Sequence, residues 1–140
     1  MRDELVRELR AAHPALFAPD ARISCRDGWH GLLSSLCRYL DSLVAAGTPA
    51  VQIREVKQKF GKLRIRAVGG DATTVALLEA CEAASVYMCE TCGQPGELVL
   101  ARGVEVACPA CRSAGAVPLE AAALAGILQP TPVVAHGGGR

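Results

Sequence analysis

Residues 89–111 read CETCGQPGELVLARGVEVACPAC and contain two Cys-x-x-Cys pairs separated by fifteen residues. Each pair places two thiolates on one tight turn, where both can reach the same ion. This spacing is typical of a structural zinc site, in which four sulfurs complete the tetrahedron that Zn²⁺ prefers. The sequence therefore predicts a closed four-cysteine zinc centre. Its expected ligands are Cys89, Cys92, Cys108 and Cys111.

Two other chemistries use Cys-x-x-Cys pairs, and the surrounding residues disfavour both. A redox pair is expected at the start of a helix that follows a strand, whereas Cys89 follows a predicted helix. Zinc deaminases combine Pro-Cys-x-x-Cys with an upstream His-x-Glu, but none of the three histidines is followed two residues later by a carboxylate. Four cysteine ligands also leave no coordination position for water, which indicates a structural ion.

The residues between the two pairs predict the short hairpin of a zinc ribbon. Turn residues follow the first pair, and two apolar, β-branched segments at residues 98–100 and 104–106 lead to the second pair. We therefore expect an α+β fold in which helices pack on a β-hairpin and a zinc ribbon follows. The expected divisions are residues 1–88 for the α+β domain, 89–112 for the ribbon, 113–128 for a short helix and 129–140 for a flexible tail.

Three segments before the ribbon have the apolar periodicity of helices. The first ends near Ala12, before a His-Pro step that disfavours helix. The second ends at Gly47, and the third begins after Asp71, a natural N-cap. Pro19 and the segment 26–28 are typical of loops, so irregular structure is expected between the first two helices.

Residues 51–68 predict a β-hairpin, because β-branched and charged residues alternate on either side of a central Phe-Gly pair. In the first strand Val56 is out of phase with Val51 and Ile53, as an inserted residue would make it. A β-bulge is therefore expected in that strand.

The same hairpin concentrates positive charge in a chain whose formal net charge is only +1. Six basic residues and one glutamate fall within residues 54–66. A basic two-stranded ribbon can follow a phosphate backbone, but an exposed hairpin face is also charged to oppose further strand pairing. Acidic protein surface is a third target for such a patch. The candidate partner-binding residues are Arg54, Lys57, Lys59, Lys62, Arg64 and Arg66.

Three further cysteines lie outside the zinc pattern. Cys37 and Cys81 fall on apolar helix faces, where a free cysteine behaves as a small hydrophobe. Cys25 with His30, next to Trp29, offers a nucleophile and a base, but no orienting group or oxyanion device accompanies them. The charged amino terminus, the lack of a predicted membrane span and the thiol-rich composition predict a cytoplasmic protein, and no catalytic residue is expected.

Several motifs stand in an order that resembles a known family. They are CRDGW at residues 25–29, VKQKFGKLR at 56–64 and CETCGQPG at 89–96. In this order they resemble a family of small uncharacterised proteins found widely in bacteriophages and bacterial genomes, over about residues 4–111. Ile65-Arg66 and Val104 depart from the aromatic residues that are common there. The resemblance implies a compact zinc-containing domain in phages or mobile elements, with no established activity.

Three functions agree with these observations. The first is a non-catalytic zinc module whose basic hairpin and ribbon bind nucleic acid or a protein. The second is an inhibitor or immunity-like protein that blocks a toxin or a host-defence enzyme. The third is an enzyme with an unrecognised site near Cys25, Trp29 and His30. The first is preferred because it uses the two strongest features, and neither a small-molecule substrate nor a membrane is expected as its partner.

Overall fold

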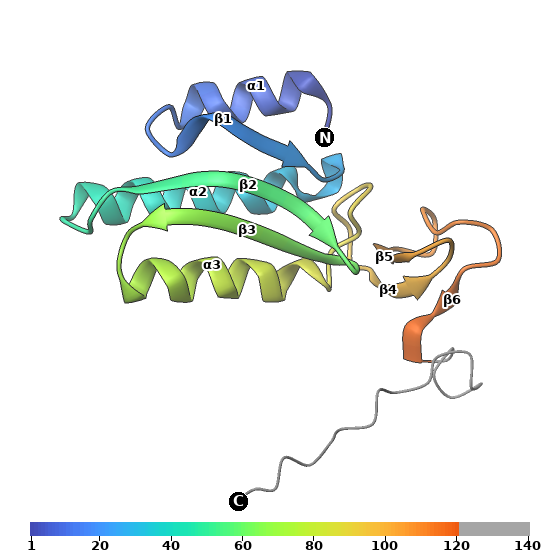
Figure 1. Cartoon of the computed structure of the whole chain (residues 1–140). Coiled ribbons are helices and arrows are strands. Elements are labelled where there is room, and N and C mark those ends of the chain that lie inside the picture. Colours follow the sequence, from blue (N-terminus) through green and yellow to red (C-terminus); the bar gives the residue numbers. More distant parts are fainter. Residues whose placement is uncertain (121–140) are drawn as a thin grey trace, which may run out of the picture.

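The computed structural model describes residues 1–120 and has an α+β fold (Figure 1). Among these residues, none of the helices combines the length and apolarity needed to cross a membrane. Residues 113–118 run through a turn into a short strand, whereas positions 121–128 of the expected helix and the expected tail lie outside the described residues.

The elements are α1 (Asp3–Ala12), β1 (Phe17–Ser24), the 3-10 turn η1 (Asp27–Trp29), α2 (His30–Ala45), β2 (Val51–Lys59), β3 (Lys62–Gly69), α3 (Ala72–Ser85), β4 (Glu97–Leu100), β5 (Val104–Ala107) and β6 (Val117–Pro118).

The larger sheet has the strand order β1-β2-β3, with β1 parallel to β2 and β2 antiparallel to β3. Helix α2 connects the two parallel strands, as a parallel pair requires. The prediction of irregular structure between the first two helices is therefore wrong for this segment, because Phe17–Ser24 forms β1. Pro19 is compatible with this strand because β1 is an edge strand whose register shifts between Phe17 and Arg22.

Strands β2 and β3 form the predicted hairpin, and the predicted bulge is confirmed. The register shifts between Ile53 and Glu55, which leaves Arg54 as the extra residue. This insertion returns Val56 to the buried face beside Val51 and Ile53, all of them at most 3% exposed.

The hydrophobic core lies between this sheet and the helices. In Figure 1, α2 lies behind the sheet, α1 runs beside β1 and α3 beside β3, so none of these helices crosses the near face. The core joins Trp29 and Leu33 to Leu63 of β3 and Cys81 of α3, and it also includes Val106 of β5. The helix–sheet body and the C-terminal strands thus share one core.

At both edges of the larger sheet, side chains form hydrogen bonds with backbone groups that a further strand would need. On the β1 side, the Arg10 guanidinium donates to the carbonyl oxygens of residues 18, 19 and 21. On the β3 side, the backbone N–H of Leu63 donates to Ser85 Oγ at 2.9 Å, and that of Ile65 donates to Glu82 Oε2 at 2.7 Å. These contacts oppose the addition of a further strand at either edge of the sheet.

Asp71 begins α3 as the sequence predicts. Its Oδ1 accepts from the backbone N–H groups of Thr73 and Thr74, and Thr74 Oγ1 accepts from the Asp71 N–H, which completes a capping box. We expect Asp71→Ala to lower the free energy of unfolding by about 1 kcal/mol. Urea unfolding measures this, with Thr73→Ala as the exposed control that keeps the cap. Equal stability of the two variants would show that the cap contributes nothing.

Candidate metal centre and basic sheet face

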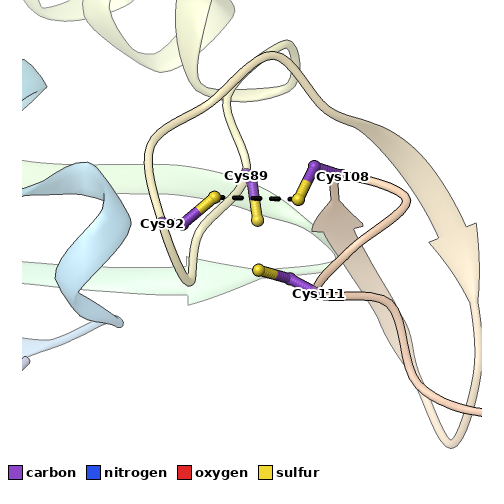
Figure 2. Close-up of side chains that lie close together, drawn as sticks. All are labelled: Cys89, Cys92, Cys108 and Cys111. Atoms are coloured by element: carbon purple, nitrogen blue, oxygen red, sulfur yellow. Dashed lines mark hydrogen bonds between the residues drawn. The ribbon is translucent and has the colours of Figure 1, made fainter.

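The four predicted ligands come together at one point (Figure 2). Their sulfur atoms all lie within 4.8 Å of one another, and the Sγ atoms of Cys92 and Cys108 are 3.7 Å apart. Tetrahedral coordination with Zn–S bonds of about 2.3 Å requires sulfur separations of about 3.8 Å. The cluster thus has the donor type and spacing to hold a metal ion.

Two tight turns position the four sulfurs. In the first turn the Cys89 N–H donates to the carbonyl of Gln94 at 2.7 Å, and the Gly93 N–H donates to the carbonyl of Cys89 at 2.8 Å. Gly93 has a φ of 80°, a conformation that favours glycine. In the second turn the Cys111 N–H donates to the carbonyl of Cys108 at 3.1 Å.

Strands β4 and β5 pair antiparallel between these turns, close to the predicted segments, and make the expected ribbon. The short strand β6 adds to β4 and was not expected.

The environment of Cys89 favours the thiolate that metal binding requires. Burial raises the pKa of this thiol, but backbone N–H groups of Cys108, Cys92 and Thr91 stabilise the thiolate and lower the pKa to about 6. Cys89 is thus a thiolate near neutral pH, whereas a side-chain hydrogen bond with Cys108 raises the pKa of Cys111 to about 12, so metal binding at the cluster releases protons.

The first of the two tight turns, residues 89–94, is called the metal-binding turn below, and it rests on the segment that contains Gly28 and Trp29. The Gly28 N–H donates to the carbonyl of Glu90 at 2.9 Å, and Trp29 Nε1 donates to the carbonyl of Met88 at 2.9 Å. A Cβ atom at position 28 would lie 2.2 Å from the carbonyl oxygen of Cys89. Sequence reasoning identified the Gly-Trp motif without this role, because the contact joins segments about sixty residues apart.

The tip of the β2–β3 hairpin also contacts the ribbon. Gln58 Nε2 donates to Glu90 Oε1 at 3.2 Å and to the carbonyl of Val104 at 3.0 Å. Gly61 packs so closely that an added Cβ atom would lie 2.5 Å from Leu98 Cδ2. The buried Glu90 side chain, 2% exposed, thus links the metal-binding turn to the hairpin.

The remaining cysteines are core groups. Burial is the main cause that raises the pKa of Cys25 to about 11 and those of Cys37 and Cys81 to about 12. All three thiols are therefore protonated near neutral pH, the form that is a poor nucleophile. Trp29, close to Cys25 in the sequence, is fully buried.

The structure brings the six predicted basic residues onto the uncovered face of the larger sheet. Alternate residues of a strand share a face, and the basic positions alternate with the buried Val56 and Leu63. Strand β1 adds Arg22, which sequence reasoning missed because β1 itself was not predicted. We define the basic face as Arg22, Arg54, Lys57, Lys59, Lys62, Arg64 and Arg66. Its cross-strand pairs are Lys57 with Arg64 and Lys59 with Lys62, and Glu55 is paired with Arg22 and Arg66.

A polar hollow of about 260 Å³ lies on this face at the bulge. Three guanidinium groups and two carboxylates line it, which leaves an excess of positive charge. Arg54 Nε is buried there and has no hydrogen-bond partner among the described residues. A buried donor without a partner is unusual in proteins, and an anionic oxygen would satisfy it. The lining residues are Asp20, Arg22, Arg54, Glu55 and Arg66.

The chain was compared with known proteins, and no family model, curated protein or solved structure matches it. Its own geometry shows an α+β fold with a four-cysteine cluster that can hold a metal ion.

Proposed function

We propose that this protein is a non-catalytic, zinc-stabilised module of a phage or mobile element that binds nucleic acid through its basic face. The observation that carries the proposal is the gathering of seven basic side chains on a sheet face that none of the helices α1, α2 and α3 covers. Four thiolate ligands favour zinc over harder divalent cations. The ion has a structural role, because four cysteines fill its coordination shell.

The arrangement of charge suits a polymer of phosphates. Cross-strand pairing sets the basic side chains in rows, and successive rows stand two residues apart, or about 7 Å along the strands. The one glutamate in the rows, Glu55, is opposite Arg22 on one side and Arg66 on the other. Repeated positive charge along one direction gains affinity from counterion release on a nucleic acid backbone.

Charge reversal on the basic face tests this proposal. We expect Lys62→Glu combined with Arg64→Glu to weaken binding of labelled DNA or RNA by at least tenfold, because each change replaces attraction to a phosphate with repulsion. The slope of log affinity against log salt should fall by about 2, because two basic side chains no longer neutralise phosphates. Fluorescence anisotropy over a series of salt concentrations measures both quantities.

The matched control reverses two exposed charges elsewhere. Arg7 on α1 and Arg38 on α2 are exposed and lie outside the basic face. Arg7→Glu combined with Arg38→Glu makes the same change in net charge and should leave most of the affinity intact. Equal losses in the two double variants would contradict a specific surface, and wild-type protein that binds acidic protein but no nucleic acid would favour an inhibitor.

A further inference from the structure

Phe60 occupies an unfavourable position at the tip of the β2–β3 hairpin. It has a φ of 54°, followed by Gly61 with a φ of 77°, so both central residues of this two-residue turn are left-handed. Asparagine, aspartate or glycine normally occupies the first of these positions, and a bulky residue there is an outlier. The ring is also 75% exposed. A strained backbone that presents an apolar ring to solvent indicates a functional role for the ring.

The ring borders a cavity between the hairpin tip and the ribbon. The cavity has a volume of about 890 Å³, which is within the range of ligand sites. Its positive groups are Arg26 and Arg102. The carboxylate of Glu105 in its wall is already held by Arg26 at 3.4 Å and by Ser113 at 3.3 Å. Because Arg26 is paired with Glu105, Arg102 supplies the remaining positive charge. The cavity thus combines an aromatic edge with one positive charge in excess and backbone groups, which suits a planar base attached to phosphate.

Phe60 also adjoins the basic face. The Lys59 ammonium lies 5.8 Å from the centre of its ring, and Lys59 pairs with Lys62 across the turn. A strand whose phosphates follow the basic face can therefore bring a base to the ring. Base stacking of this kind requires an unpaired base, because the bases of a duplex are stacked on one another.

We propose that Phe60 is a stacking platform that makes this protein selective for single-stranded nucleic acid, with one unpaired base lying against the ring at the mouth of the cavity. This inference rests on the proposed function and adds the class of nucleic acid to it.

The test compares wild-type protein with Phe60→Asn on three labelled probes: an oligothymidylate, an abasic strand of the same length, and a duplex. Asparagine suits the left-handed turn, so this variant is expected to fold at least as stably as the wild type. Wild-type protein should bind oligothymidylate most tightly. Phe60→Asn should weaken that binding about 5- to 100-fold. The affinity for the abasic strand should not change, because that strand has phosphates but no bases to stack.

Two controls complete the experiment. Phe60→Trp should bind oligothymidylate as tightly as the wild type, because tryptophan keeps a stacking ring at this position. Tyr39→Ala removes another exposed aromatic side chain, 65% exposed on α2, and should change nothing. If Phe60→Asn binds every probe like the wild type while Lys62→Glu combined with Arg64→Glu still weakens binding by at least tenfold, the stacking inference is wrong and the proposed function stands. If wild-type protein binds none of the probes, the proposed function itself is wrong.

Discussion

Removal of the metal ion is expected to unfold most of this protein. Structural zinc sites contribute about 10–16 kcal/mol of apparent binding free energy at neutral pH, whereas a whole domain is stable by only about 5–15 kcal/mol. Without an ion, the ribbon retains three short strands of at most four residues each, which are too short to be stable alone. Cys108→Ser or a strong chelator should therefore cause a large loss of stability.

The loss should extend beyond the ribbon because the two parts share a core. Val106 of β5 packs in the main cluster, and the turn that carries Cys89 is bonded to Gly28 and Trp29. Trp29 is the single tryptophan of the chain and is fully buried. Its fluorescence should shift to longer wavelength when the metal is removed.

Thermal melts that follow this fluorescence, with and without chelator, measure the effect. Cys81→Ala is the control, since Cys81 is a buried cysteine outside the cluster and its replacement should leave metal content unchanged with a modest loss of stability. A wild-type melt that chelator does not alter, in protein shown to have lost its metal, would contradict a structural role for the ion.

Gly28→Ala is expected to have the second-largest effect. The added Cβ atom would stand 2.2 Å from the carbonyl oxygen of Cys89 and 2.6 Å from the carbonyl carbon of Glu90. These are backbone atoms of the metal-binding turn, so no side chain can rotate to make room. Either the turn moves and distorts the cluster, or the bond from the Gly28 N–H to Glu90 lengthens. We expect a loss of about 3 kcal/mol in the free energy of unfolding and weaker zinc binding.

The matched control is Gly31→Ala, three residues further along. A Cβ atom at Gly31 meets nothing within 4 Å, and alanine favours helix more than glycine does by up to about 1 kcal/mol. This variant should be as stable as the wild type or slightly more stable. Urea unfolding followed by Trp29 fluorescence compares the two, and equal stability of the alanine variants would show that the close approach has no energetic importance.

Features encoded by neighbouring residues could be predicted from the sequence. The helix N-cap at Asp71, the bulge that returns Val56 to the core and the ribbon between the cysteine pairs are all confirmed. Each depends on a local pattern: a side chain that bonds the next turn, a phase change in alternation, or two ligands on one turn. The four-cysteine cluster could be predicted from the spacing of its two Cys-x-x-Cys pairs alone.

Features that depend on distant contacts could not be predicted in the same way. Strand β1 contains Pro19 and lacks regular alternation, and its partner β2 lies beyond a sixteen-residue helix. The addition of Arg22 to the basic face followed from that strand and was missed with it. Gly28 resembled an ordinary loop glycine, and only the packed structure shows that the backbone of Cys89 lies against it.

Native mass spectrometry of the full chain, mixed with oligothymidylate, tests the central claim that zinc holds the fold while the basic face binds nucleic acid. Wild-type protein should carry a single zinc ion and add the oligonucleotide without losing the ion. Protein with Lys62→Glu and Arg64→Glu should keep the ion and, at the same concentrations, add far less of the oligonucleotide. Metal-free wild-type protein that binds equally well, or displacement of the ion by the oligonucleotide, would contradict the claim.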